Sequence, residues 1–259
     1  MPEIPDLEVF SHNLNKKLRG KTIKKLRVPE TKKLKMSATT LRKQLQGQTI
    51  AAIYRSGKAL FFACKDGTVL SLHLMLRGKL EWFEKKNQHK YTVLEFLFDD
   101  DTGLALTDVH RQATPALNPE AKQAPDALSK QVNTSFLKRL LQQSDKPVKT
   151  VLTDQGTIRG LGNAYTDEIL YHARIAPMST SNKIPEEKVK QLARSIKTVL
   201  KNAQKQIRKM DPDTIGGELR DFMAVHNRRK TKSPGGATIK RITLNSRKTY
   251  YTSEQKLYK

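Results

Sequence analysis

The sequence predicts an α+β fold with two domains, the first built on antiparallel strands and the second on helices. Three observations support this prediction. Short β-type runs follow one another closely up to residue 107, helical periodicity dominates from residue 135 to residue 207, and a segment rich in Ala and Pro separates the two regions. With 259 residues, the chain is long enough for two domains that each bury a core.

The first domain begins with a predicted amphipathic helix over residues 5–19. Its apolar side chains recur at helical spacing, Pro5 is compatible with a first turn, and Gly20 marks the end. Seven β-type runs follow, over residues 22–28, 49–55, 59–64, 68–74, 79–83, 91–98 and 104–107. Seven strands at this spacing are typical of an antiparallel sandwich or a barrel. We expect the first domain to cover residues 1–112.

Beyond this domain the alternating pattern is lost, and residues 113–130 are predicted to be a linker because Ala and Pro dominate there. Four helical segments then follow, over residues 135–143, 146–154, 163–174 and 185–207. The last one carries a continuous apolar stripe that starts just after Pro185, which predicts a helix packed on a core. We expect this helical domain to cover residues 131–222.

The final segment, residues 223–259, loses the helical pattern and is strongly basic. Within it, the stretches "SPGGATI" and "RKTYYTSEQ" predict two short strands and a glycine turn. A disordered basic tail is the alternative. Disordered tails rarely carry apolar and aromatic residues such as Ile239, Leu244 and Tyr250, so we favour a folded segment.

Composition narrows the class of partner. The net charge of +24, from 49 Lys and Arg against 25 Asp and Glu, predicts a polyanion, because binding phosphates releases counterions. Nucleic acid is the first candidate and an anionic membrane the second. The sequence has no run of 18 apolar residues and no signal-peptide pattern, so we expect a soluble, intracellular protein without a membrane partner. The single cysteine, Cys64, lies in an apolar run, which predicts a buried inert thiol and excludes a disulfide.

The first residues have the chemistry of a nucleophile. If Met1 is removed, as a small second residue usually permits, Pro2 becomes a free secondary amine beside Glu3. An amine next to a carboxylate can form an imine and has its own acid/base group. A start codon followed by Pro-Glu is equally compatible with no role at all.

Residues 154–177 are the most informative for binding nucleic acid. The turn Gly160-Leu161-Gly162 delivers Asn163 to the first turn of a predicted helix. Unpaired backbone amides and the helix dipole can hold a phosphate there. Gly and Asn before a helix are also typical of ordinary capping, so these residues alone leave phosphate binding and capping open.

This segment resembles the helix-two-turns-helix motif of the formamidopyrimidine-DNA glycosylase/endonuclease VIII family, in which a Gly-x-Gly-Asn turn grips the DNA backbone. Six further stretches resemble the family in order: "PEIPDLE", "SGKAL", "HLMLRGKL", "PDAL", "KPVKTVL" and "ARIAP". The resemblance covers nearly the whole chain. It implies an N-terminal β-sandwich flanked by helices, a helix-two-turns-helix domain and a C-terminal β-hairpin finger.

The resemblance implies a bifunctional DNA glycosylase/AP lyase that excises oxidised bases from damaged DNA without a cofactor. Pro2 would attack C1′ of the damaged nucleotide and leave a Schiff base, whose positive charge promotes β- and δ-elimination. Glu3 would transfer protons at the sugar. Lys58 would supply a cation to a phosphate beside the lesion. Without the motif, Lys58 is typical of a solvated strand end.

The family usually ends in a four-cysteine zinc finger, and this chain has none of those cysteines. Residues 233–237 and 251–255 stand at the cysteine positions, and His226 is alone, so we predict a finger without zinc. The stretch "RKTYY" aligns with the family's finger hairpin, whose arginine contacts phosphates. The resemblance therefore assigns Arg247 to DNA binding.

The residues that would fill the gap left by an extruded nucleotide also differ. The family uses a Met, an Arg and a Phe, whereas this chain has Leu76, His110 and Gln112 at those positions. His73 and Arg111, in the same two motifs, are also expected on the DNA. Leu76 suits an apolar wedge. His110 and Gln112 do not indicate which opposite base the protein would select.

Only two residues separate "GELRDF" from "VHNRR", where purine-specific members carry a longer loop that caps 8-oxoguanine. This favours oxidised pyrimidines, ring-opened purines, hydantoins or abasic sites. A non-catalytic nucleic-acid-binding protein on the same scaffold is the alternative; it explains the charge and Asn163, but it does not need Pro2, Glu3 and Lys58 together. We expect a monomer in the cytoplasm, associated with the nucleoid if bacterial.

Overall fold

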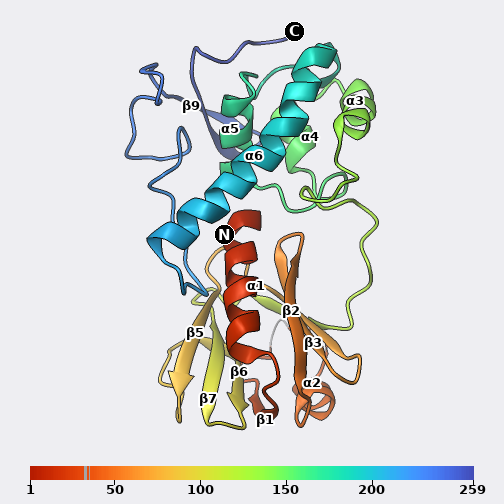
Figure 1. Cartoon of the computed structure of the whole chain (residues 1–259), viewed down its shortest axis with the longest axis vertical. Helices are drawn as coiled ribbons and strands as arrows, with labels where there is room; N and C mark the ends of the chain where they lie inside the picture. The colour runs from red at the N-terminus through yellow and green to blue at the C-terminus, as the bar shows by residue number, and fades with distance from the viewer. Residues whose placement is uncertain (32–33, 35) are drawn as a thin grey trace. The chain divides into compact units, whose positions relative to one another are not determined.

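The computed structural model of the chain describes residues 1–31, 34 and 36–259 (Figure 1). It divides into two compact units. The first comprises Met1–Ala121 and Ile207–Glu218, and the second comprises Lys122–Gln206 and Leu219–Lys259. The two-domain α+β fold predicted from the sequence is confirmed, although residues 207–218, which we expected in the helical domain, belong to the first unit.

Two four-stranded antiparallel sheets form the body of the first unit. One has the order β1 (Ile23–Arg27), β6 (Thr92–Phe98), β7 (Thr102–Thr107), β5 (Lys79–Glu84). The other has the order β2 (Ile50–Ser56), β3 (Ala59–Cys64), β4 (Val69–His73), β8 (Thr114–Leu117). Alternating burial along β3 turns Phe62 into the core, where its ring stacks on Phe96 of the other sheet at 5.9 Å. The two sheets therefore share one core, as a sandwich does.

Helix α1 (Ile4–Leu18) covers the sandwich and contacts β2 (Figure 1). Leu7, Phe10 and Leu14 recur at helical spacing and are fully buried. The Asn13 amide, on the same helix, donates to the carbonyls of Pro212 and Thr214, both at 2.8 Å. These bonds explain why residues 207–218 belong to the first unit.

The structure adds two elements that the sequence analysis missed. Strand β8 lies within the segment predicted to be a linker, because its four residues are too few to show alternation and include a proline. Helix α2 (Ala38–Leu45) begins at Ser37, whose hydroxyl accepts from the Thr40 amide at 3.0 Å. Only Leu41 and Leu45 of this helix are buried, so its apolar periodicity is weak.

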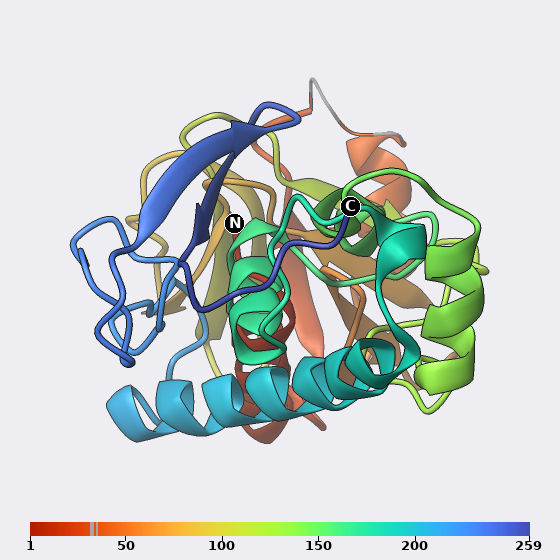
Figure 2. The same cartoon turned by 90° about the horizontal axis from the view of Figure 1, so that it is seen from above.

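The second unit contains the four predicted helices, which are confirmed with small shifts at their ends. They are α3 (Thr134–Gln142), α4 (Val148–Thr153), α5 (Asn163–His172) and α6 (Glu186–Met210), with a short 3₁₀ helix at Ser181–Lys183. The last residues of α6 fall in the first unit. Strands β9 (Lys240–Leu244) and β10 (Arg247–Tyr251) form an antiparallel hairpin. Figures 1 and 2 show α5 lying between α6 and this hairpin.

The C-terminal hairpin differs from the prediction. We expected the first strand within "SPGGATI" and a glycine turn, but β9 starts after this stretch and the turn is Asn245-Ser246. Both turn residues have positive φ, 48° and 60°, which is the backbone of a two-residue type I′ hairpin. Asn tolerates this conformation better than most residues, so the turn needs no glycine.

Cys64 is buried, as predicted, with 5% of its surface exposed. Burial, reinforced by the nearby Asp66 carboxylate, raises the pKa of the Cys64 thiol to about 11. The thiolate is therefore scarce at neutral pH, and a nucleophilic role for this residue is disfavoured.

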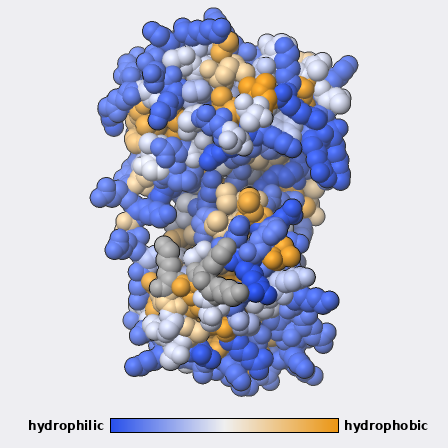
Figure 3. All heavy atoms as spheres, turned by 180° about the vertical axis from the view of Figure 1, so that it is seen from behind, coloured by the Kyte–Doolittle hydropathy of each residue, from blue (hydrophilic) through white to orange (hydrophobic). Residues whose placement is uncertain are grey.

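Most of the face drawn in Figure 3 is hydrophilic, with apolar residues in small separate groups. No helix in the described part of the chain is both long enough and apolar enough to span a bilayer.

Candidate functional site

Pro2 and Glu3 lie directly before α1 and are buried. Glu3 is the N-cap residue, and its backbone N–H donates to the Asp6 carboxylate at 2.8 Å. The Glu3 carboxylate accepts from the Asp6 backbone in return, which completes a capping box. The positive end of the helix dipole and the capping box therefore fix the acid next to the predicted nucleophile.

Met1 is present in this structure, and its amino group forms an ion pair with Glu218. The nitrogen of Pro2 is then an amide, which is not nucleophilic. The chemistry expected of Pro2 therefore requires removal of Met1.

Lys58 lies in the tight turn between β2 and β3, not on a strand. Ser56 and Ala59 pair across the hairpin, so Gly57 and Lys58 form a two-residue loop. Gly57 has a φ of 60° at the first loop position, as a type II′ turn requires. The motif "SGKAL" is thus a turn motif that presents a half-buried lysine.

Arg55 ties this turn to α1. Its Nε donates to the Glu8 carboxylate at 2.7 Å, and its Nη1 donates to the Gly57 carbonyl at 3.0 Å. The Arg55 side chain is only 5% exposed, so this link is well shielded from water. Lys58 is therefore held on the same helix that begins at Glu3.

Two loops of the first unit, residues 74–78 and 108–113, run between the two sheets. Because β4 pairs with β8 and β5 pairs with β7, both loops connect the same two pairs of strands and lie side by side. Leu76 is 62% exposed on the first loop, and Val109 is 52% exposed on the second. Exposed apolar side chains on neighbouring loops suit insertion into a base stack.

The second loop is held rigidly by the buried Asp108 carboxylate. It accepts backbone hydrogen bonds from His110 at 2.9 Å and from Gln112 and Ala113 at 2.7 Å each. His110 is exposed, whereas Gln112 is half-buried. The apolar residue that this loop offers to solvent is thus Val109, which the sequence analysis did not select.

His73 and Arg111 both have partners within the protein. The His73 Nδ1 accepts from the Met75 amide at 3.2 Å, which braces the loop that carries Leu76. The Arg111 guanidinium forms an ion pair with Glu30 at 2.7 Å. More than half of the Arg111 side chain is nevertheless exposed, so it adds positive charge beside the same loops.

In the second unit, Asn163 is the first residue of α5, and the preceding N-cap is Gly162, which has no side chain. Gly162 therefore fills the ordinary capping position, and Asn163 itself is not the cap. The Asn163 Nδ2 donates to the Lys248 carbonyl at 2.8 Å and has a second hydrogen to give. Gln155 holds the preceding turn through bonds to the Gly160 amide and the Leu161 carbonyl.

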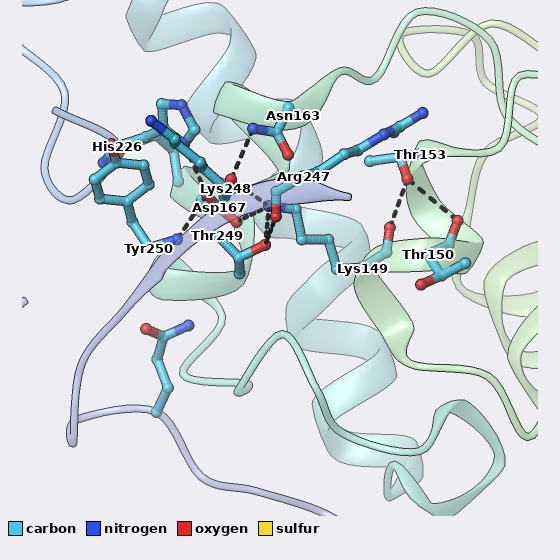
Figure 4. Close-up of polar contacts among 12 residues, drawn as sticks. Lys149, Thr150, Thr153, Asn163, Asp167, His226, Arg247, Lys248, Thr249 and Tyr250 are labelled. Carbon is cyan, nitrogen blue, oxygen red and sulfur yellow. Dashed lines mark hydrogen bonds and ion pairs between the residues drawn. The ribbon is translucent and has the colours of Figure 1, made fainter. Parts of the chain in front are cut away.

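A buried polar network docks β10 onto α4 and α5 (Figure 4). The Lys149 ammonium lies 2.7 Å from the Asp167 carboxylate and 2.8 Å from the Thr249 hydroxyl. The second oxygen of Asp167 accepts from the Tyr250 amide at 3.0 Å and lies 2.7 Å from the His226 Nδ1. Both charged groups of the ion pair are at most 2% exposed.

Arg247 is exposed at the start of β10, next to the residue that Asn163 contacts (Figure 4). The hairpin turn is pinned to α4, because the Asn245 amide donates to the Thr150 hydroxyl at 2.7 Å. Arg247 lines a pocket of about 440 Å³ between the hairpin and α4. Asn163 and Arg247, which the resemblance assigns to DNA, are thus joined through one network in one unit.

The short segment after Phe222 is held by Glu168 of α5. This carboxylate accepts from the amides of Ala224, Val225 and His226 at 2.7–2.8 Å. Burial raises the pKa of Glu168, while the three amides lower it. Because Met223 is also buried, no free lid remains between the two sequence motifs.

Five residues that hold the candidate functional residues in place could not be recognised from the sequence: Arg55, Asp108, Lys149, Asp167 and Glu168. Their partners are distant in the sequence, so spacing does not reveal them. One sequence feature could have indicated them: a charged residue inside an apolar pattern, such as Lys149 in "KPVKTVL".

Two family profiles and several relatives match this chain. The family profile described as the formamidopyrimidine-DNA glycosylase N-terminal domain matches residues 1–114, and that of the H2TH domain matches residues 123–211. A formamidopyrimidine-DNA glycosylase of Lactobacillus gasseri is 30% identical over the full length of both chains. The enzyme of Bacillus licheniformis is 34% identical over 78% of each chain.

Solved structures give the same result. The Lactococcus lactis enzyme in complex with abasic-site DNA has a TM-score of 0.88 and 26% identity, covering 98% of this chain and 99% of that one. A variant of that enzyme bound to Fapy-dG-containing DNA matches equally well, with a TM-score of 0.88 at 26% identity over the same shares of the two chains. With both domains, a full-length relative and the whole fold in agreement, the chain belongs to the formamidopyrimidine-DNA glycosylase family.

Proposed function

We propose that this chain is a bifunctional DNA glycosylase/AP lyase that removes damaged bases and then cleaves the DNA at the abasic site. The observation that carries the proposal is the start of α1. Glu3 is a buried cap directly after Pro2, and Arg55 ties the Lys58 turn to the same helix. A chain that only binds nucleic acid needs none of these three features.

In the proposed reaction, Met1 is first removed and the Pro2 nitrogen attacks C1′ of the damaged nucleotide. A C–N bond forms, and the base leaves with the electrons of the glycosidic bond and a proton. Opening of the sugar ring then gives an iminium ion, which withdraws electrons from the adjacent carbons. Elimination breaks the C3′–O bond and then the C5′–O bond, and water releases the free proline.

Glu3 would donate a proton at the ring oxygen during opening and accept one during elimination. Lys58 would pair with the phosphate beside the lesion. Asn163 would donate its second Nδ2 hydrogen to the DNA backbone. The Arg247 guanidinium would bind the backbone as well. Leu76 would fill the gap left by the extruded nucleotide.

For the substrate, we propose oxidised pyrimidines, hydantoins or abasic sites in preference to 8-oxoguanine. Of the two residues between the motifs, Met223 is buried and Ala224 donates its amide to Glu168, so we propose that this segment does not fold over a purine. The relatives are named for formamidopyrimidine, a ring-opened purine, which is non-planar and also needs less enclosure. We further propose that the protein acts as an intracellular monomer, without zinc or another cofactor.

A non-catalytic DNA-binding role is the second candidate, because the net charge of +24 and Asn163 serve binding without any chemistry. If Met1 stays in place, the Pro2 nitrogen cannot form a Schiff base. The intact mass shows whether Met1 is absent, and cleavage of abasic DNA by the species that lacks Met1 then separates the two candidates. A population that keeps Met1 and still cleaves abasic DNA would exclude Pro2 as the nucleophile.

A further inference from the structure

Family members usually stabilise the C-terminal finger, residues 223–259 in this chain, with zinc. The question is what stabilises it here. Zinc sites in proteins use thiolates, imidazoles and carboxylates. The four cysteine positions hold Ser233, Gly236, Thr252 and Gln255, and the one carboxylate within these two stretches is that of Glu254. In the described part of the chain, no three His, Cys, Asp or Glu side chains gather as a metal site. These residues do not fit zinc, so another interaction must join the two ends of the finger.

The Glu254 carboxylate lies where those two ends meet. Its Oε2 accepts from the Ser233 hydroxyl at 2.5 Å and from the Thr252 hydroxyl at 3.1 Å. Its Oε1 accepts from the Arg174 guanidinium at 2.6 Å and from the Tyr171 hydroxyl at 3.3 Å. One side chain thus has four protein donors and links three segments: the loop before β9, the loop after β10 and the end of α5.

The loops around Glu254 leave space for its carboxylate. A Cβ placed on Gly235 would overlap the Glu254 Oε1, so a larger residue here would displace the carboxylate from its present position. The neighbouring Gln255 continues the link, because its amide donates to the Ile175 carbonyl at 2.8 Å and its Oε1 accepts from the Thr252 amide at 2.9 Å. The loop sequence therefore depends on Glu254 being in this position.

We propose that the Glu254 carboxylate is the anchor that replaces the metal of the finger and, with Arg174 and Ser233, holds the β9–β10 hairpin on α5. Glu254 is a positioning residue, since it lies away from Arg247 and acts on it only through the hairpin. The effect on DNA rests on the proposed function, whereas the effect on folding does not.

The first test replaces Glu254 in the full-length chain. Glu254→Ala is expected to lower Tm by at least ~3 °C. Hydrogen exchange should accelerate in residues 231–256 and stay unchanged in the first unit. Glu187→Gln is the control, because it removes a negative charge from an exposed position of the same unit. Adding zinc or a chelator should change neither protein.

The second test is a double-mutant cycle. Gly235→Ala should destabilise the unmodified chain, because the new Cβ displaces the carboxylate, but it should have little effect in the Glu254→Ala background. Equal destabilisation in both backgrounds, or an unchanged Tm and exchange pattern in Glu254→Ala, would overturn the proposal.

The DNA readout separates this proposal from the proposed catalysis. For Glu254→Ala we expect KM on abasic DNA to rise ~5-fold or more, with kcat unchanged, because the reacting residues lie in the other unit. A KM that stays constant while Tm falls would overturn the positioning role. Absence of cleavage by the unmodified chain would instead count against the proposed function and would leave the Tm and exchange tests valid.

Discussion

At the scale of single residues, buried carboxylates fix the backbone around the candidate site. Asp108 and Glu168 each accept three backbone amides, and Glu3 caps α1. Each of them satisfies donors that would otherwise be left unpaired next to a binding surface. These carboxylates are not proposed to contact the substrate. They set the geometry of the residues that we propose do contact it.

For Glu168 this account predicts a large effect of a small change. Glu168→Gln replaces one acceptor oxygen by an NH₂ group that faces a backbone N–H. The free energy of unfolding should fall by about 1–3 kcal/mol, because a buried donor loses its partner. Urea denaturation measures this value, and the isosteric Glu187→Gln change on the exposed face of α6 serves as control. A change within error of the control would contradict the assigned role.

Leu76 is the residue whose substitution should separate function from folding. Since Leu76 is 62% exposed, Leu76→Ala should leave Tm unchanged within about 1 °C. Extrusion of the damaged nucleotide should be slower, because the apolar wedge is lost. Single-turnover excision, with a fluorescent base analogue opposite the lesion, follows both steps. Wild-type extrusion in Leu76→Ala would point to Val109 as the wedge.

At the scale of elements, the β9–β10 hairpin depends on two anchors, Lys149–Asp167 at one end and Glu254 at the other. Lys149→Met leaves the Asp167 carboxylate buried without its cation, which should cost about 3–5 kcal/mol. Combining it with Asp167→Asn removes the uncompensated charge and should recover part of the loss. Thermal or urea unfolding of the two variants tests this, and equal stability of both would contradict the assigned ion pair.

The Glu254 anchor also predicts a pH dependence. The Ser233 hydroxyl, followed by Arg174, holds the pKa of Glu254 at about 2, below its usual value of 4.5. A lowered pKa stabilises the fold above the usual value, and this contribution is lost as pH falls through the folded value. The stability difference between the unmodified chain and Glu254→Gln should therefore be constant above pH ~5 and shrink towards pH ~2. A gap that widens in acid would contradict this sign.

Strands with a continuous run of β-forming residues could be predicted from the sequence, and β3 has the predicted bounds, Ala59–Cys64. The failures have physical causes. Strand β8 is too short to alternate, and the Asn245-Ser246 turn reaches positive φ without glycine. The anchors Lys149 and Glu254 resemble solvated charges in a sequence, because their partners come from segments up to 100 residues away. Chemistry and resemblance together proposed roles for Pro2, Glu3, Lys58 and Asn163, but neither indicates which residues hold them in place.

At the scale of the whole molecule, the net charge of +24 predicts that the DNA backbone supplies most of the affinity. Binding should therefore weaken steeply with salt for any sequence. If Arg247 contacts a phosphate, Arg247→Ala should lower the affinity by about 1–3 kcal/mol and reduce the slope of log K against log salt by ~1. Fluorescence anisotropy at several salt concentrations measures both. An unchanged slope would remove Arg247 from the phosphate contacts.

The central claim is that the chain performs chemistry through Pro2, and reductive trapping tests it most directly. With borohydride present, protein that lacks Met1 should become covalently joined to abasic-site DNA, because only a Schiff base is reduced to a stable amine. Peptide mass spectrometry should locate the cross-link at Pro2, and Pro2→Gly should show the cross-link reduced or shifted. Absence of trapping by the Met1-free protein, or a cross-link on a lysine with Pro2 intact, would contradict the account.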